Sequence, residues 1–493
     1  MTPSSFPSEG KVVQFRHLLR LEILAGLALL ASCTPTPRVD ETRQATGVKV
    51  GEVTDTSAIV WMRVTEKAER RADGVVRRGR AREELGPELR PKDLEGSVPG
   101  APGRVRLRYG TGADLAAAKQ TDWADVSAED DFTHKFHLND LKSSTVYHYS
   151  AETSGPGGSP LHLPLRGRFK TAPPPDEYGE VSFTVITGQA YRDVDDDEGF
   201  LIYDSMLQLN PDFIVPTGDT VYYDSDDPRA TDIDLARYHW QRIYSYPKLV
   251  RFHLNVPGYW EKDDHDVWAD DSWPAQVREP DIMKSFTFQQ GLQVYAEQVP
   301  MSEKPYRTFR WGKGLQIWLT EGRDFRSPNT MPDGPEKSIW GAEQKKWLME
   351  SLLASDADWK VLISPTPIVG PDRPNKRDNH ANATFAHEGN EFRRFAQKNL
   401  SENFFLACGD RHWQYHSVHP ETGVQEFSCG PASDEHAGGS PGEDPDYHKF
   451  HRVQGGFLSV SVVGSENESR ITFRLHAVDG SVVYTYIRSR PSH

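Results

Sequence analysis

Residues 213–224 have the sequence FIVPTGDTVYYD, an apolar strand pattern that runs into a Gly-Asp pair. By itself, a Gly-Asp pair after a strand is typical of a turn. Here a strand pattern precedes it at 181–186, and helix patterns follow both strands, at 199–209 and 232–246. This alternation predicts an α/β layered domain. Because open α/β sheets bind ligands beyond the carboxyl ends of their strands, Asp219 is a candidate site residue.

The alternation continues toward the carboxyl end of the chain. A strand is expected at 252–256, and the clear helix pattern GAEQKKWLMESLLA at 341–354 precedes strand patterns at 359–363 and 404–408. Further strands are expected at 457–463, 470–476 and 481–487. We therefore expect the layered domain to span residues 180–490.

The chain before residue 175 has a different pattern. Short segments rich in β-branched and aromatic residues predict an immunoglobulin-like β-sandwich over residues 46–174. Residues 66–103 are rich in Arg and Glu and have no apolar period, which predicts a mobile, solvated insertion. The proline run at 171–176 marks a linker between the two domains.

The amino-terminal segment has the features of an export signal. Basic residues precede the apolar run ILAGLALLA at 23–31, which is shorter than the roughly 20 residues that span a bilayer. Leu-Ala-Ser-Cys at 30–33 resembles a bacterial lipoprotein box, so we expect a signal peptide over 1–32, lipid on Cys33 and a tether over 33–45. The alternative is an ordinary signal peptide with a cysteine by chance.

The charge balance excludes a general nucleic-acid binder. The 493 residues include 57 Lys and Arg against 72 Asp and Glu, a net charge of −15, whereas phosphate backbones bind basic surfaces. Three cysteines are too few for a disulfide scaffold. An exported compartment would permit a bond between Cys408 and Cys429, but the sequence leaves that open.

Further polar clusters follow other strand patterns. Asp263-Asp264-His265-Asp266 follows the expected 252–256 strand, and Gly409-Asp410-Arg411-His412 follows the 404–408 strand. Neighbouring carboxylates repel one another unless a cation neutralises them or they face water. Carboxylates together with His suit metal ions. The set therefore predicts a metal site.

In this order the motifs Gly-Asp-x-x-Tyr, Asp-Asp-His-Asp and Gly-Asp-x-His-Trp resemble those of the PhoD-like alkaline phosphatases, calcineurin-like metallophosphoesterases. The resemblance covers nearly the whole chain after the signal segment and implies a four-layer α/β/β/α sandwich. It also implies metal-ligand roles for Asp219 as the bridge between two metals, Tyr222 as a phenolate ligand of iron, Asp264, Asp410, His412 and Gln189.

The resemblance implies two further roles at the reaction centre. His265 binds phosphate or protonates the leaving oxygen, and Asp266 orients His265. Arg323 follows a strand and offers a planar fork for phosphate; the alternative is a salt bridge. Asp263 is either a further metal ligand or a loop carboxylate that faces solvent.

One position departs from the family pattern. Many members have Ser-Cys-Gln after the first strand, with the Cys as an iron ligand, whereas this chain has Thr187-Gly188-Gln189. Gly188 has no side chain to bind a metal. Substitutes near it are Asp193, Asp195, Asp196, Asp197 and Glu198, unless these form a solvated loop.

Together these patterns predict an exported, membrane-anchored metallophosphoesterase that hydrolyses phosphomonoesters or phosphodiesters. Two or more metal ions are expected: Ca²⁺ near Asp264 and His412, and Fe³⁺ or Zn²⁺ near Tyr222. The expected partners are a small-molecule, lipid or polymer phosphate ester and, through the lipid alone, a membrane. Two alternatives are a non-catalytic calcium-binding surface lipoprotein and a phospholipase D-like diesterase.

Overall fold

The computed structural model of the chain describes residues 39–82, 84–277, 281–400 and 402–492. Cys33 and the predicted signal peptide lie outside these residues. No helix in the described ranges is both long enough and apolar enough to cross a bilayer.

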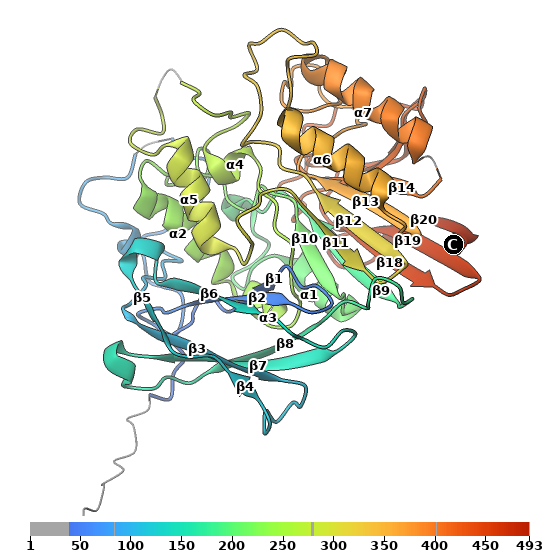
Figure 1. The fold of residues 1–493 in the computed structure, drawn as a ribbon. Helices are drawn as coiled ribbons and strands as arrows, with labels where there is room; N and C mark the ends of the chain where they lie inside the picture. The colour runs from blue at the N-terminus through green and yellow to red at the C-terminus, as the bar shows by residue number, and fades with distance from the viewer. Residues whose placement is uncertain (1–38, 83, 278–280, 401, 493) are drawn as a thin grey trace, which may run out of the picture. The chain divides into compact units, whose positions relative to one another are not determined.

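Two β-sheets make up the amino-terminal part of the described chain (Figure 1). One has the order β1 (Lys49–Gly51), β2 (Ala58–Arg63), β6 (Thr133–Leu138). The other has the order β4 (Lys119–Gln120), β3 (Gly103–Gly110), β7 (Val146–Ser154), β8 (Leu165–Lys170), with β5 (Ala124–Val126) also paired to β3. Val60, Leu107 and Tyr149, all buried, belong to one apolar core that joins the two sheets. The predicted β domain is thereby confirmed.

The layered domain has two further sheets. The five-stranded sheet has the order β10 (Phe213–Pro216), β9 (Val181–Ile186), β18 (Phe457–Gly464), β19 (Glu468–His476), β20 (Val482–Pro491). The seven-stranded sheet has the order β11 (Arg307–Trp311), β12 (Leu315–Leu319), β13 (Trp359–Ser364), β14 (Phe404–Cys408), β16 (Gln425–Cys429), β15 (Gln414–Val418), β17 (His448–Arg452). Strands β9 with β10, and β12 with β13 and β14, pair in parallel, so their carboxyl ends share one edge of each sheet.

Helices cover the outer faces of both sheets. The helices α6 (Gly341–Ala354) and α7 (Ala386–Asn399) pack on the seven-stranded sheet through Leu348 and Phe392 (Figure 1). On the five-stranded sheet lie α1 (Leu201–Leu209), α2 (Ile233–Tyr244), α3 (Pro247–His253) and α5 (Phe288–Gln298). A separate core joins the inner faces of the two sheets, with Val185 and Ile363 among its buried members. The predicted α/β/β/α order of layers is confirmed.

Two local predictions are wrong. Residues 252–256 form the end of α3 and a turn rather than a strand, because Pro247 starts a helix at its first position. The extended pairing begins later, where the Tyr259 N–H donates to the Ile214 carbonyl at 2.9 Å.

The segment 66–103 is not a solvated insertion. Leu94 is fully buried in the core beneath α2, and Arg77 pairs with Asp227 of the layered domain at 2.7 Å. Only a few side chains of the segment are buried, and these are enough to hold it in place. Most of its residues are charged and lie at the surface, so the sequence shows no apolar period.

Candidate active site

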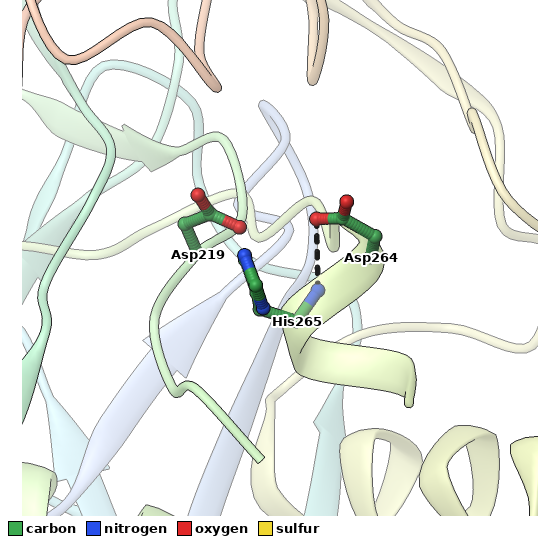
Figure 2. Close-up of side chains that lie close together, drawn as sticks. All are labelled: Asp219, Asp264 and His265. Carbon is green, nitrogen blue, oxygen red and sulfur yellow. Dashed lines mark hydrogen bonds between the residues drawn. The ribbon is translucent and has the colours of Figure 1, made fainter. Parts of the chain in front are cut away.

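The predicted Asp clusters meet at the carboxyl ends of the strands. Asp219 follows β10, Asp263 and Asp264 lie at the start of the short helix α4 (Asp264–Val267), and Asp410 follows β14. Carboxylate oxygens of Asp219, Asp263 and Asp410 lie within 4.8 Å of one another. Ligand atoms of Asp219, Asp264 and His265 form a second such group; in Figure 2 the His265 ring stands beside Asp219.

The local backbone explains why these positions are close. Gly218 has φ +96°, and a Cβ there would lie 2.5 Å from the Asp263 backbone nitrogen, so only glycine allows this approach. Asp219 and Asp410 also have positive φ values, 53° and 59°, which are uncommon for residues with a side chain. Such backbone strain clusters at functional sites.

Several carboxylate oxygens at this position lack the partners that burial requires. Asp219 Oδ1 and Asp263 Oδ2 are buried and have no hydrogen-bond partner among the described residues. Burial raises the pKa of Asp219 to about 6 and raises the pKa of Asp263 well above its usual range. A bound cation would supply the missing partner, so the donor set fits hard metal ions.

Asp264 is held differently. Its Oδ2 accepts the Asp271 N–H at 2.6 Å, and its Oδ1 accepts the backbone N–H of His265 at 2.9 Å (dashed in Figure 2). Burial acts to raise the pKa of Asp264, but nearby Arg323 and His265 outweigh it and hold that pKa below its usual range. Asp264 is therefore an anionic ligand candidate.

Tyr222 lies at the centre of a second set of donors. Its hydroxyl is 3.0 Å from Asp219 Oδ2, 3.3 Å from His412 Nε2 and 2.7 Å from His436 Nε2. The structure thus brings Tyr222 and His412 to Asp219. His412 was expected beside Asp264 at the calcium-like position and lies with Tyr222 instead. His436 was not predicted as a site residue. It lies in the loop after β16, and an inspection of the polar residues that follow each strand would have included it.

Three predicted roles do not match the geometry. Asp266 does not orient His265. Its carboxylate accepts hydrogen bonds from the backbone N–H groups of residues 220, 221 and 263, and these bonds fix the loop after β10 to the start of α4. Gln189 is fully buried, and its side-chain oxygen accepts from the Tyr203 hydroxyl rather than facing the acidic cluster. Gln189 instead braces Asp219 through its backbone N–H, at 2.8 Å from the Asp219 carbonyl.

Arg323 also has a different position from the one predicted. It is fully buried, and its guanidinium contacts Asp263 Oδ1 at 2.6 Å and Asp378 Oδ2 at 3.2 Å. Since it does not line the cavity, it orients Asp263 rather than binding phosphate. The sequence signal was a strand-end arginine, which does not distinguish a buried ion pair from a ligand contact.

The site opens into a cavity of about 1050 Å³. Its lining includes Asp219, Tyr222, His265 and His412, and four cationic side chains, namely Arg80, Arg192, Arg373 and Lys376. Carboxylates hold Arg192 and Lys376, whereas Arg80 forms no ion pair with any residue in the described ranges. A cavity with carboxylates at the floor and cations in its walls suits an anionic ligand that also contacts metal ions.

The neighbouring cysteines play no part in the site. Cys408 and Cys429 are buried free thiols. The Cys429 Sγ donates a weak hydrogen bond to the Cys408 carbonyl, with the two atoms 3.6 Å apart. The candidate site is therefore made of carboxylates, imidazoles and a phenol.

Comparison with solved structures supports the layered fold. A structure of PhoD superposes with a TM-score of 0.68 at 15% identity and covers 92% of this chain and 92% of that chain. A purple acid phosphatase from yellow lupin (Lupinus luteus) seeds superposes with a TM-score of 0.56 at 12% identity, over 89% of this chain and 73% of that chain. The chain therefore shares the fold of these two phosphatases.

Sequence comparison then defines the family. The model of the PhoD-like phosphatase family matches residues 183–456, and the model of the PhoD-like phosphatase N-terminal domain matches residues 30–173. The chain belongs to the PhoD-like phosphatase family. Alkaline phosphatase D of Bacillus subtilis (strain 168) is 23% identical over 275 residues, which are 48% of this chain and 45% of that protein. The match thus spans less than half the length of this curated relative.

Proposed function

We propose that this protein is a metal-dependent phosphoesterase that hydrolyses phosphomonoesters, phosphodiesters or both. The observation that carries the proposal is a pair of buried carboxylate oxygens without hydrogen-bond partners among the described residues, on Asp219, which lines a cavity with cationic walls, and on Asp263, whose carboxylate lies within 4.8 Å of that of Asp219. Leaving such groups buried without a partner costs free energy, so their retention points to a bound ion.

The residues divide into two overlapping donor sets. Asp263 and Asp410 form an oxygen-rich set with Asp219 that is suited to Ca²⁺, and Asp264 adjoins Asp219 in a neighbouring group. Tyr222 with His412 forms a set suited to Fe³⁺ or Zn²⁺, and Asp219 is common to all of them. Metals bound there would neutralise phosphate oxygens and lower the pKa of a water nucleophile.

His265 has the geometry of a proton donor. Its Nδ1 lies 2.6 Å from Asp224 Oδ1, while its Nε2 is 4.0 Å from Asp270 at the cavity wall. Burial acts to lower the pKa of His265, but Asp224 and Asp264 outweigh it and raise that pKa well above its usual range. The contact with Asp224 favours the protonated ring, and its Nε2 would give a proton to the leaving oxygen.

The cationic wall would bind the rest of the phosphate. Arg192 and Arg373 present planar forks and Lys376 a point charge, all directed at the same cavity as His265. Together they would orient the ester so that its leaving oxygen faces His265.

We further propose that the protein acts outside the cytoplasm, attached to a membrane by lipid on Cys33. The support is the apolar run before Leu-Ala-Ser-Cys, residues that lie outside the described part of the chain. The substrate would be a small-molecule, lipid or polymer phosphate ester. The net charge of −15 disfavours nucleic acid as a partner.

The test is hydrolysis of p-nitrophenyl phosphate and bis-p-nitrophenyl phosphate, each with and without chelator, together with metal analysis of the same samples. We expect activity that chelation removes, and at least two metals per chain after reconstitution with calcium, iron and zinc. Preference for the diester would favour the phospholipase D-like alternative. Bound calcium without activity toward either ester would overturn the proposal in favour of a binding lipoprotein.

A further inference from the structure

His436 occupies a central position that the motifs do not include. It lies in the loop after β16, is only 7% exposed and lines the cavity. Its Nδ1 is 2.7 Å from Asp193 Oδ2, and its Nε2 is 2.7 Å from the Tyr222 hydroxyl. Its ring centroid is 4.0 Å from that of His412. Asp193 thus holds the imidazole with its second nitrogen directed at Tyr222.

The position of His436 is linked to Gly188. A Cβ placed on Gly188 would lie 3.2 Å from His436 Cδ2, tighter than an ordinary contact. Gly188 also has φ +64°, which disfavours a side chain. The imidazole, together with Pro431, whose Cβ would also lie 3.2 Å away, fills the space into which a side chain at position 188 would extend.

The Tyr222 hydroxyl has one hydrogen to donate, but it faces two hydrogen-bond acceptors, Asp219 Oδ2 and His436 Nε2. Because Nδ1 of His436 faces a carboxylate, that nitrogen carries the proton of a neutral ring, and Nε2 presents a lone pair. Asp219 Oδ2, at 3.0 Å, also needs a hydrogen from the phenol, yet a phenol has only one. A cation among these atoms would bind all of them once the phenol loses its proton.

The distances from the Tyr222 oxygen to three neighbouring atoms are close to those between ligands of one ion. Ligands that lie about 2.0–2.2 Å from one ion lie roughly 3–3.5 Å from one another. The phenol oxygen of Tyr222 lies in this range from Asp219 Oδ2, at 3.0 Å, and from His412 Nε2, at 3.3 Å. His436 Nε2 is closer, at 2.7 Å, and His412 Nε2 is 3.8 Å from Asp219 Oδ2, so a bound ion would need only small shifts of these side chains. Imidazole and phenolate donors suit iron or zinc better than calcium.

We propose that His436 is a metal ligand at the Tyr222 site, and that its imidazole takes the place that a side chain at position 188 would fill. The inference rests on the proposed metal-dependent function. It gives this chain a nitrogen and oxygen donor set, made by His436, Tyr222, His412 and Asp219, in place of a set that contains a thiolate. Asp193 then acts as a positioning residue for the His436 ring.

The experiment uses metal-free full-length protein titrated with Co²⁺ and followed by visible absorption. The variant is His436→Gln, which keeps a hydrogen-bond acceptor for Tyr222 but is a poor ligand. His387→Gln, at an exposed position of α7, is the matched control. We expect His436→Gln to weaken one Co²⁺ site by about 100-fold or more, with the second site and the control unchanged. With iron bound, the Tyr222 phenolate charge-transfer band should shift in His436→Gln and disappear in Tyr222→Phe.

The outcomes separate this inference from the proposed function. If the wild type binds no metal, the metal-dependent function itself is overturned. If the wild type binds two ions and His436→Gln has the same affinities and iron spectrum, then His436 is only a hydrogen-bond partner and the inference is overturned. Should His436→Gln fail to fold, Asp193→Asn supplies the measurement, with an expected weakening of the same site by about 10-fold; an unchanged affinity would overturn the inference.

Discussion

The Nδ1 atom of His265 lies 2.6 Å from Oδ1 of Asp224, a residue 41 positions earlier in the chain. Asp224 is buried, and its other oxygen accepts the Asp270 N–H at 3.1 Å, which fixes the direction of the carboxylate. The pair leaves Nε2 of His265 to face the cavity. Asp224 therefore orients His265, the role that the motif assigned to Asp266.

The pair predicts a non-additive double-mutant cycle. His265→Ala should lower turnover by about 10²–10⁴-fold with metal content nearly unchanged. Asp224→Asn should lower turnover by about 10–100-fold and move the alkaline limb of the pH profile to lower pH, because the carboxylate raises the pKa of His265. In the double variant, Asp224→Asn should add little. Loss of metal in His265→Ala, or full additivity, would contradict these roles.

Asp219→Asn should abolish activity and the binding of both metals without loss of folding. Burial raises the pKa of Asp219 to about 6, so metal-free protein loses stability as pH rises from the unfolded value near 4 through about 6. At pH 7 the metal-free variant should therefore melt no lower than metal-free wild type, measured by calorimetry after chelation. A lower Tm would show that Asp219 is structural, and near wild-type activity would exclude the site.

The packing of segment 66–103 predicts a stability effect. Leu94→Ala should destabilise the protein by about 2–5 kcal/mol, because Leu94 is fully buried in the core beneath α2. Val76→Ala in the same segment is the control, since Val76 is 62% exposed. Thermal unfolding compares the two; equal Tm values would mean that the segment does not dock in solution.

Arg80 lines the cavity from the same segment and predicts an effect on phosphate binding. Arg80→Ala should raise the inhibition constant for inorganic phosphate and the KM by about 3- to 10-fold, with little change in kcat, as expected for an exposed charge. Arg82→Ala, at an exposed position two residues away, should have no effect. If both variants behave alike, Arg80 acts only through net charge.

The amino-terminal motif predicts lipid attachment at Cys33. Cys33→Ser should leave the precursor uncleaved and free of labelled palmitate, with the activity of the layered domain intact. The measurement is metabolic labelling followed by membrane fractionation. A wild-type protein that is cleaved, soluble and unlabelled would instead show an ordinary signal peptide.

Part of the site was predictable because some of its residues come directly after strands whose sequence pattern can be recognised. Asp219 and Asp410 directly follow the parallel strands β10 and β14, at the carboxyl ends where α/β sheets place their ligand sites. Asp264 begins α4 and was expected at the site only through a strand at 252–256 that does not form. The strand at 213–216 and the helix at 341–354 were likewise predictable from apolar periodicity, which reflects the faces that must be buried.

Where side chains point, and which distant segment they meet, was decided by the tertiary structure. Asp266 adjoins His265 in sequence, but a helical turn directs its carboxylate to backbone N–H groups, and Asp224 becomes the partner instead. Arg323 follows a strand, but burial turns it toward Asp263 and away from the cavity. The ring of His436 that contacts Tyr222 also packs against Gly188, where a Cβ would lie 3.2 Å from its Cδ2. Local periodicity in the sequence predicted most of the strands and the acidic residues that follow them, and the resemblance to the family implied the order of the layers. The pairing of ionic and polar groups was left to the tertiary structure, because it depends on which segments exclude water together.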